Sequence, residues 1–376
     1  MRVALKNIRA FVMSEKRNCV IIIPSLNPEE GLIDYVKELK NSGFDKILLV
    51  DDGSRNESKF LFATLKTEYG CDLITHDVNY GKGRALKNAF AYYHNENLSG
   101  KYSDCIGVIT ADSDGQHTVP DVLKLAEALP NCSDSLILGV RDFDDESVPP
   151  KSETGNKISR VMLRLFVGGD VTDTQTGLRA VPNSLIERFS LLPGERFEYE
   201  TKMLIDCIKS KINIKEIPIR TVYIDGNKET HYRPIADSIS IFKVIAGTFF
   251  KYILSSLSSF LLDYGLFCLI LFVAGLFIDN AKEKVAIWIA TVIARICSSL
   301  FNYFVNKTLV FDSQKGMKTL VYYYILVVVQ MAASAALVSL TTSCLPIPAQ
   351  FSKLIVDTLL FLLSYQIQKR LIFKAE

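Results

Sequence analysis

The chain has 376 residues, of which 49% are hydrophobic, and its formal net charge is +2. This near-neutral balance argues against a nucleic-acid-binding protein, which would show a basic patch and a strongly shifted pI. The apolar residues concentrate from about Ile253 onward, whereas the first part holds most of the Asp and Glu. We therefore predict a soluble domain over residues 1–234, an interfacial helix over 235–251 and a membrane domain over 252–376.

The N-terminal segment Met1–Asn18 lacks the apolar region of a cleavable signal peptide. The eight cysteines form no C-x-x-C pair, which argues against a zinc site or a redox pair. These two features predict free thiols in a reducing compartment and a soluble domain that stays in the cytoplasm.

Short apolar segments then alternate with helical patterns. The predicted strands are Cys19–Pro24, Lys46–Val50, Cys71–Ile74, Cys105–Thr110 and Ser135–Leu138. The predicted helices are Glu29–Ser42, Phe60–Tyr69, Arg84–Asn97 and Val119–Leu129. This alternation is typical of an α/β fold in which helices cover both faces of a mostly parallel sheet. Ligands bind such sheets at the carboxyl ends of the strands.

Two later segments break the alternation. Asp142–Lys157 is polar and has two prolines and no periodicity, which predicts a long functional loop. In Ile235–Lys251, apolar residues recur at helical spacing, which predicts a helix lying on a membrane surface.

Four segments of the last third are long and apolar enough to cross a bilayer. The predicted spans are about 253–278, 285–305, 320–340 and 351–373. The connection after the second span and the C-terminal tail carry Lys and Arg, whereas the connection 341–350 carries neither. This distribution predicts that both termini are cytoplasmic, although Lys282 and Lys284 after the first span are a mild exception.

The sequence Asp112-Ser113-Asp114-Gly115-Gln116 directly follows the fourth predicted strand. Carboxylates two residues apart in extended chain point the same way. Together with the Gln116 carbonyl they predict a site for Mg²⁺ or Mn²⁺, which prefer oxygen ligands. An isolated D-x-D is more often a polar turn, but its place after an apolar strand and the neighbouring motifs favour the metal site.

Two other strand ends carry polar turns that suit a nucleotide. Asp51 and Asp52 follow the second strand, where a carboxylate can accept hydrogen bonds from a base or ribose. The first strand ends in Pro24-Ser25-Leu26-Asn27, which would form the adjacent wall. Each is also an ordinary turn-forming sequence, so only their combination on successive strands indicates a site.

Phosphate binding is indicated by glycine and by basic residues. Asn79–Ala85 contains Lys82 between two glycines and precedes a helix, whose N-terminus suits phosphate. Arg141, Lys157 and Arg160 flank the predicted loop, and Arg can hold phosphate oxygens bidentately. In both cases solvated surface charge is an equally good interpretation.

Two further polar segments lie later in the chain. Asp173–Arg179 runs between apolar segments and is a candidate sugar pocket, with Asp173, Gln175 and Thr176 as its residues. Phe197–Glu200 opens a helix, where acidic side chains are favoured by the helix dipole alone. For the two glutamates, a position set by the helix dipole is the favoured interpretation.

Taken together, these motifs resemble glycosyltransferase family 2, in the branch with dolichol-phosphate mannose synthases and bacterial undecaprenyl-phosphate glycosyltransferases. The matching sequences are IIIPSLNPEE from Ile21, LLVDDGS from Leu48, NYGKGRAL from Asn79, ITADSDGQH from Ile109 and DTQTGLRA from Asp173. They occur in the family's order over most of residues 19–225. The resemblance implies a GT-A type α/β fold and inversion at the sugar carbon.

The same resemblance assigns the site residues. It implies a metal at Asp112, Asp114 and Gln116, with Asp114 and Arg141 as catalytic residues. The residues assigned to the nucleotide-sugar are Pro24, Leu26, Glu29, Asp51, Asp52, Lys82 and Asp112. The acceptor phosphate is assigned to Arg141 and the basic helix after it, with Lys157 and Arg160.

The membrane part resembles the four-helix GtrA-like domain. The resemblance rests on Phe301–Lys307 ending at Val310-Phe311, with a degenerate repeat at Leu363–Phe373. Such domains are associated with the handling of lipid-linked sugars.

The predicted reaction transfers a sugar from a nucleotide-sugar to a polyprenyl phosphate, at the cytoplasmic face of the cell membrane. A UDP-sugar is favoured over GDP-mannose, and a homo-oligomer is left open. Because a lipid phosphate is already anionic near neutral pH, the reaction needs no strong general base. Metal-ion and electrostatic catalysis are expected instead.

Two alternatives compete with this reaction. A processive polysaccharide synthase would need a Gln-x-x-Arg-Trp motif, but Trp288, the single tryptophan, lies in a predicted span. A lipid-linked sugar transporter would use charged residues inside the spans, here Asp263, Arg295 and Asp357. These residues have no such role if they pair with each other or lie at helix ends, and the intact D-x-D favours an enzyme.

Overall fold

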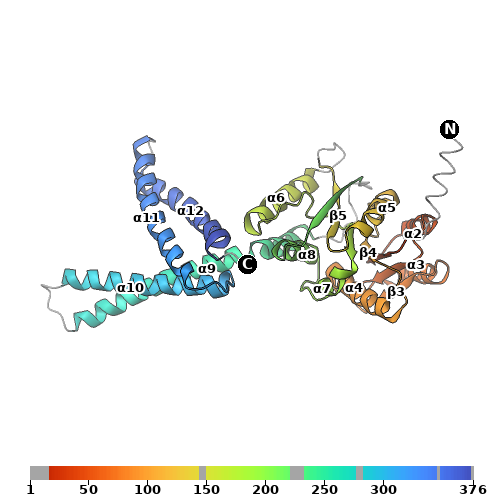
Figure 1. Cartoon of the computed structure of the whole chain (residues 1–376), viewed down its shortest axis with the longest axis horizontal. Coiled ribbons are helices and arrows are strands. Elements are labelled where there is room, and N and C mark those ends of the chain that lie inside the picture. Colours follow the sequence, from red (N-terminus) through yellow and green to blue (C-terminus); the bar gives the residue numbers. More distant parts are fainter. Residues whose placement is uncertain (1–16, 144–149, 221–232, 277–282, 345–347, 374–376) are drawn as a thin grey trace. The chain divides into compact units, whose positions relative to one another are not determined.

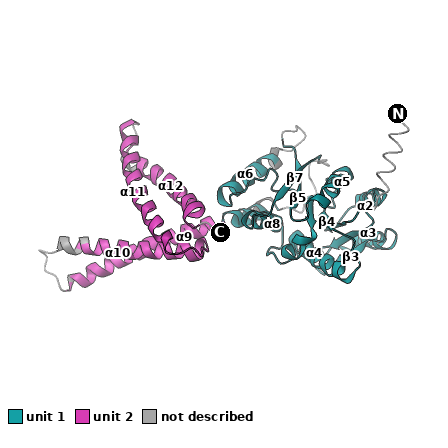
Figure 2. Cartoon of the chain, in the orientation of Figure 1, with its two compact units in different colours: residues 1–246 teal, residues 247–376 magenta. Residues whose placement is uncertain are grey.

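The computed structural model describes residues 17–143, 150–220, 233–276, 283–344 and 348–373. The chain divides into two compact units, residues 1–246 and 247–376 (Figure 1, Figure 2). The boundary falls inside helix α9 (Pro234–Gly275), within the segment predicted as an interfacial helix. Each unit is described below by itself.

Unit 1 is built on one seven-stranded sheet. Its strands are β1 (Val20–Ser25), β2 (Ile47–Asp51), β3 (Asp72–Thr75), β4 (Gly107–Thr110), β5 (Leu136–Arg141), β6 (Arg179–Pro182) and β7 (Ile214–Ile219). They lie in the order β3-β2-β1-β4-β6-β5-β7. Strand β6 runs antiparallel to both β4 and β5, and the other pairs are parallel. The predicted mostly parallel α/β sheet is therefore confirmed.

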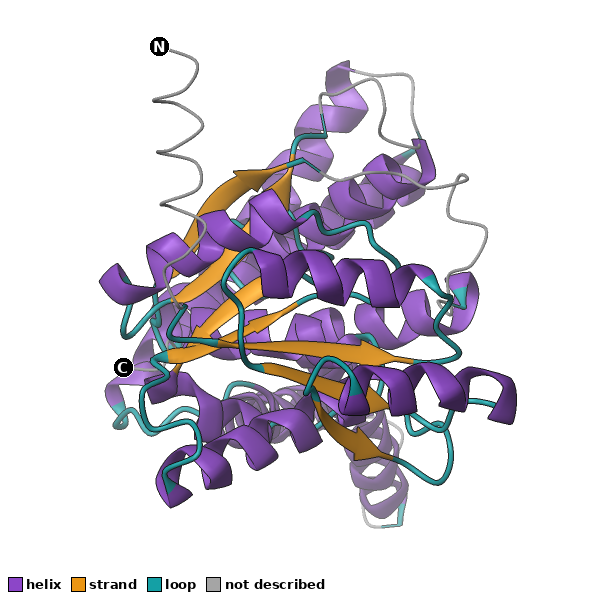
Figure 3. Cartoon of the chain, turned by 90° about the vertical axis from the view of Figure 1, so that its right-hand side faces the viewer, coloured by secondary structure: helices purple, strands orange, loops and turns teal. Residues whose placement is uncertain are grey.

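Both faces of the sheet are covered by helices (Figure 3). Along β1, Val20 and Ile22 belong to one apolar cluster, whereas Ile21 and Ile23 belong to the other. One face packs against α4 (Lys82–Ser99), α7 (Asn183–Ser190) and α8 (Glu198–Lys209). The other packs against α2 (Gly31–Asn41), α3 (Asn56–Thr67) and α5 (Val119–Ala128). Strands buried on both faces read as continuous apolar runs, which is why their positions were predictable.

One part of the predicted fold is wrong. The loop predicted over Asp142–Lys157 is helical from Pro150 onward, because α6 covers Pro150–Phe166; residues 144–149 lie outside the described residues. Proline is favoured at the start of a helix, where its missing N–H costs no hydrogen bond. The first half of α6 is polar, so hydrophobic periodicity did not reveal it.

Strand β6 brings the segment before it to the functional edge of the sheet. Thr110 at the end of β4 pairs with Arg179 at the start of β6. Because β6 is antiparallel, its first residue lies at the carboxyl ends of the parallel strands. The run Asp173–Arg179 therefore reaches the edge at which β1, β2 and β4 end.

Unit 2 is helical and lies in the membrane part of the chain. Its helices are the later part of α9, α10 (Glu283–Val305), α11 (Lys318–Cys344) and α12 (Ala349–Ile367). In the described residues, three helices are long and apolar enough to cross a membrane: Ala236–Ala274, Ile289–Val310 and Lys318–Cys344. The fourth predicted span coincides with α12, and its crossing stays a prediction.

The predicted interfacial helix and the first span form one continuous helix, α9. Ile241 and Ile245 in its first part pack into the core of unit 1, whereas Ile239 and Phe242 are exposed. The position of this segment on a membrane surface stays a prediction.

Helices α10 and α12 end in equivalent structures. Each continues into a π-helical turn, Asn306–Val310 and Gln368–Ile372. The amide of Asn306 donates a hydrogen bond to Gln368 Oε1 at 3.0 Å. The phenylalanines that close the two turns, Phe311 and Phe373, stack with centroids 5.4 Å apart. The sequence repeat thus corresponds to a structural repeat whose two copies contact each other.

Candidate active site

Asp112 and Asp114 lie just beyond β4, at the carboxyl edge of the sheet. The Asp112 backbone N–H donates to His117 Nδ1 at 3.0 Å, and the Gln116 N–H donates to Asp114 Oδ1 at 3.0 Å. Gly115 has φ +73° and closes this turn. The turn therefore holds both carboxylates at the strand end, as the D-x-D motif predicts.

Lys82 joins this turn to two other elements. Its ammonium nitrogen lies 2.7 Å from Asp112 Oδ1 and 3.1 Å from Glu200 Oε2. Burial alone would lower the pKa of Lys82, but these two carboxylates raise it, so the side chain stays cationic. Lys82 comes from the first turn of α4, so the glycine-rich motif and the D-x-D motif meet here.

Glu200 belongs to this site, contrary to the prediction that its position reflects the helix dipole alone. It is buried in the first turn of α8. Arg179 Nε lies 3.9 Å from Glu200 Oε1, and Arg179 Nη1 donates to the Glu200 carbonyl at 2.7 Å. Its burial depends on where α8 packs, and local sequence does not encode that.

Gly177 lies against the Lys82–Asp112 pair. A Cβ at this position would come within 2.5 Å of Asp112 Oδ2 and 2.9 Å of Lys82 Nζ. Only glycine lets the backbone approach so closely. The run Asp173–Arg179 thus forms one wall of the site.

The two predicted nucleotide carboxylates are engaged in local hydrogen bonds. Asp52 accepts from the backbone N–H groups of Tyr80 and Gly81 at 3.0 and 2.7 Å, and its Oδ1 lies 2.8 Å from His76 Nδ1. Asp51 accepts from the Ser54 N–H at 2.8 Å. Asp52 therefore positions the loop that carries Lys82, and contact of either carboxylate with a nucleotide stays a prediction.

The end of β1, predicted to form one side of the nucleotide site, lies next to the turn that follows β2. Pro24 pairs with Val50 in the sheet, and the Asn27 N–H donates to Ser54 Oγ at 2.8 Å. Leu26 and Glu29 lie in the same connection between β1 and α2. The structure therefore brings the ends of β1 and β2 together.

Arg141 and Asp173 form a buried ion pair at the end of β5. Arg141 Nε and Nη2 donate to the two Asp173 oxygens at 2.7 and 2.9 Å. The Gln175 N–H also donates to Asp173, at 3.0 Å, and Thr176 is buried beside it. Two of the predicted sites, for the acceptor phosphate and for the sugar, are thus in direct contact.

The other two predicted phosphate ligands lie on α6. Lys157 forms an ion pair with Glu153, and Arg160 lies 3.2 Å from Asp170. Their role at the acceptor stays a prediction.

The donor set at Asp112, Asp114 and Gln116 suits a hard divalent cation. Burial would raise the pKa of Asp112, but Lys82 and His117 lower it to about 2. Burial and the neighbouring Asp112 carboxylate raise the pKa of Asp114. A cation between the two carboxylates would relieve this repulsion. In the described part of the chain no three His, Cys, Asp or Glu side chains gather to hold a metal, and the metal site stays a prediction.

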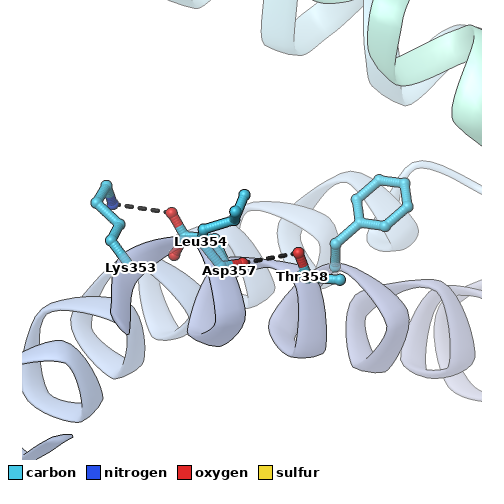
Figure 4. Close-up of a pocket in the computed structure, with 5 residues that line it drawn as sticks. Lys353, Leu354, Asp357 and Thr358 are labelled. Carbon is cyan, nitrogen blue, oxygen red and sulfur yellow. Dashed lines mark hydrogen bonds and ion pairs between the residues drawn. The ribbon is translucent and has the colours of Figure 1, made fainter. Parts of the chain in front are cut away.

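The three charged residues singled out in the predicted spans form ion pairs within the helical unit. Arg295 Nη2 lies 3.4 Å from Asp263 Oδ2. Asp357 lies 2.8 Å from Lys353 Nζ and accepts from Ser334 Oγ. Figure 4 shows the groove on α12, of about 590 Å³, that Lys353 and Asp357 line. The predicted pairing within the helices is confirmed for Asp263 and Arg295.

Comparison with known proteins finds one matching family model within each of the two units. The model of glycosyl transferase family 2 matches residues 20–191, and that of the GtrA/DPMS transmembrane domain matches residues 251–373. A UDP-N-acetylglucosamine–dolichyl-phosphate N-acetylglucosaminyltransferase of Methanococcus voltae is 30% identical over 224 residues, which cover 54% of this chain and 86% of that protein. The chain therefore belongs to glycosyltransferase family 2 and carries a GtrA/DPMS transmembrane domain.

Two further similarities have lower sequence identity. The dolichyl-phosphate beta-glucosyltransferase of Saccharomyces cerevisiae is 26% identical over 260 residues, which cover 60% of this chain and 73% of that protein. Among solved structures, residues 1–349 of S. aureus TarS align with 12% identity and a TM-score of 0.34, over 94% of this chain and 92% of that one.

Proposed function

We propose that this enzyme transfers a sugar from a UDP-sugar to a polyprenyl phosphate, with a divalent cation at the donor diphosphate. One observation carries the proposal. Lys82, Asp112 and Glu200 form a compact charged site at the carboxyl edge of the sheet, in a chain that also has a membrane domain. With one ammonium and two carboxylates, such a site suits a divalent cation that carries a donor diphosphate, and the membrane domain suits a lipid acceptor.

The acceptor class follows from the family and from the chemistry. The relatives from M. voltae and yeast are named for dolichyl phosphate, so we take this chain as a polyprenyl-phosphate glycosyltransferase. An acceptor phosphate oxygen attacks the anomeric carbon, and the bond from that carbon to the diphosphate breaks. The nucleoside diphosphate leaves with the bonding electron pair, and the sugar carbon inverts.

The residues of the site have distinct tasks in this reaction. Asp112 and Asp114 would hold Mg²⁺ or Mn²⁺ with Gln116, and the cation would neutralise charge on the leaving diphosphate. Lys82 stays cationic beside them and adds a second positive charge. Arg141 would orient the acceptor phosphate, and the buried Asp173 fixes its guanidinium.

The proposal also specifies the donor sugar and the side of the membrane on which the catalytic domain lies. The M. voltae relative is named for UDP-N-acetylglucosamine and the yeast relative for a glucosyl product. N-acetylglucosamine and glucose are therefore the first sugars to test, before GDP-mannose. The distribution of Lys and Arg between the spans supports a cytoplasmic catalytic domain.

A donor panel tests the proposal. Full-length protein in detergent is incubated with Mn²⁺, undecaprenyl phosphate and, in turn, UDP-N-acetylglucosamine, UDP-glucose and GDP-mannose. Lipid extraction and mass spectrometry should show a glycosylated lipid phosphate with one UDP-sugar. An Asp114→Asn variant of the same melting temperature should give at least about 10²-fold less product. Product only with GDP-mannose would refute the proposed donor class, and no product with any donor would refute the reaction.

A further inference from the structure

Lys82 neutralises a carboxylate that is also a proposed metal ligand. Its ammonium nitrogen lies 2.7 Å from Asp112 Oδ1. The backbone of Gly177 packs on the other oxygen, since a Cβ there would come within 2.5 Å of Asp112 Oδ2. A divalent cation that binds Asp112 through Oδ1 would meet the ammonium there. Like charges at such short range repel each other strongly in a buried site, so the ion pair and the coordination bond compete.

A second carboxylate offers Lys82 another partner at the start of α8. Lys82 Nζ lies 3.1 Å from Glu200 Oε2 and 5.8 Å from the centre of the Phe197 ring. The side chains of Lys82 and Glu200 are only 16% and 8% exposed. An ammonium that moves off Asp112 therefore stays within reach of a buried anion and an aromatic face.

The Glu200 carboxylate depends on Lys82 for its charge balance. In the described part of the chain, Glu200 Oε1 accepts no hydrogen bond, and Arg179 Nε lies 3.9 Å from it. The Arg179 guanidinium is held by two backbone carbonyls instead, that of Thr176 at 3.0 Å and that of Glu200 at 2.7 Å. A buried carboxylate that loses its partner is strongly destabilising, so Glu200 retains Lys82.

We propose that Lys82 and a divalent cation compete for Asp112, and that Glu200 is a positioning residue that keeps Lys82 in the site when the cation binds. The inference rests on the proposed function, because it needs a cation at Asp112 and Asp114. The ammonium released from Asp112 then pairs with the donor diphosphate while Glu200 holds it. The site thus exchanges an internal ion pair for contacts with the metal and the diphosphate.

Binding of Mn²⁺ alone tests the competition on the full-length protein in detergent, without donor or acceptor. The electron paramagnetic resonance signal of unbound Mn²⁺ gives the dissociation constant. The test variant is Lys82→Met. The matched control is Lys87→Met, which removes another cation of α4, one that is 9% exposed and pairs with Glu195 at 2.9 Å. If Lys82→Met lowers the melting temperature, Lys82→Gln takes its place, since it keeps a polar side chain without the charge.

We expect Lys82→Met to bind Mn²⁺ about tenfold more tightly than wild type, if the ion pair holds Asp112 in about nine-tenths of the molecules. Lys87→Met should change the dissociation constant much less, because its ammonium pairs with a different carboxylate. An equal gain in both variants would show general charge repulsion and would overturn the inference. Wild-type affinity of Lys82→Met would overturn it too.

Glu200→Gln tests the positioning role. Without the second carboxylate Lys82 pairs with Asp112 alone, so Mn²⁺ should bind more weakly than to wild type. In a Lys82→Met background the same change should have little effect, because Glu200 acts through Lys82. Equal weakening in both backgrounds would show that Glu200 acts on the metal directly, which contradicts the proposed role.

The outcomes separate this inference from the proposed function. Mn²⁺ binding that does not respond to Lys82→Met overturns the competition and leaves the proposed reaction intact. Wild-type protein that binds no Mn²⁺ would refute both the competition and the proposed cation.

Discussion

The ammonium nitrogen of Lys82 lies 2.7 Å from Oδ1 of Asp112. This contact joins the N-terminus of α4 to the strand end that carries the D-x-D motif. It places a fixed positive charge beside the proposed metal ligands, and the neighbouring Glu200 prevents an excess of positive charge. The contact gives the first prediction.

Replacing Lys82 by Met should lower kcat by about 10²- to 10³-fold, because one cation that stabilises the leaving diphosphate is lost. Lys59→Met removes a charge from an exposed position on α3 and serves as the control. Measured rates with the preferred UDP-sugar should show this difference at equal melting temperature. A Lys82→Met enzyme with wild-type kcat would assign the lysine a purely structural role.

Gly177→Ala should inactivate the enzyme without unfolding it. The new Cβ would come within 2.5 Å of Asp112 Oδ2, so the carboxylate must move away from its position. A displacement near 1 Å costs about 10²-fold in rate when it affects catalytic geometry. Gly31→Ala is the matched control, since a Cβ there meets nothing within 4 Å. Full activity of Gly177→Ala would contradict the close contact.

The affinity for Mn²⁺ should fall as the pH is lowered toward the pKa of Asp114. Its pKa is raised by burial and by Asp112, so Asp114 takes up a proton above the ordinary value of 3.8. The protein surrounds most of the Asp114 carboxylate, but the residue reaches the surface, which limits this rise. The metal binds the ionised carboxylate, so protonation competes with it. Asp112, with a pKa near 2, stays ionised over this range.

Isothermal titration calorimetry between pH 4 and pH 7 measures this effect, with about one proton displaced per metal ion at the acidic end. Asp114→Asn should bind Mn²⁺ weakly and without this pH dependence. Wild-type affinity that is constant over the whole range would show that Asp114 is not a ligand.

The amide pair of Asn306 and Gln368 should stabilise the helical unit. Asn306→Ala removes the donor to Gln368 Oε1, and Gln368→Ala leaves Asn306 Nδ2 with only its bond to Asn302. For hydrogen bonds between membrane helices we expect a coupling of about 0.6–2 kcal/mol. A double-mutant cycle, followed by unfolding in SDS, measures this coupling. Strictly additive effects of Asn306→Ala and Gln368→Ala would show that the pair contributes nothing beyond its separate contacts.

Strands β1, β2, β4 and β5 were predictable because they are apolar runs buried in the sheet, whereas β6 and β7 were not predicted. Strands such as β1 and β2 are continuous apolar runs, and a polar turn marks the end of each. The D-x-D turn was predictable for the same reason. Helix α6 was not, because its first half is polar and its apolar side chains lie mostly on the exposed side.

The site was less predictable than the fold. Glu200 has an ordinary reason to begin a helix, and only the packing of α8 brings it to Lys82. Asp52 was predicted to face a nucleotide, yet its carboxylate accepts hydrogen bonds from backbone N–H groups of the loop that carries Lys82. Local sequence indicates which side chains are polar and at a strand end, whereas their partners lie on other segments, 28 residues away for Asp52 and Tyr80 and more than a hundred for Lys82 and Glu200.

The central claim is that a sugar is joined to a lipid phosphate. The most direct test is to measure, in one reaction, the nucleoside diphosphate released and the glycosylated polyprenyl phosphate formed. The proposed reaction yields equal amounts of both, dependent on added Mg²⁺ or Mn²⁺ and on the lipid phosphate. Release of nucleoside diphosphate without a glycosylated lipid phosphate would contradict it.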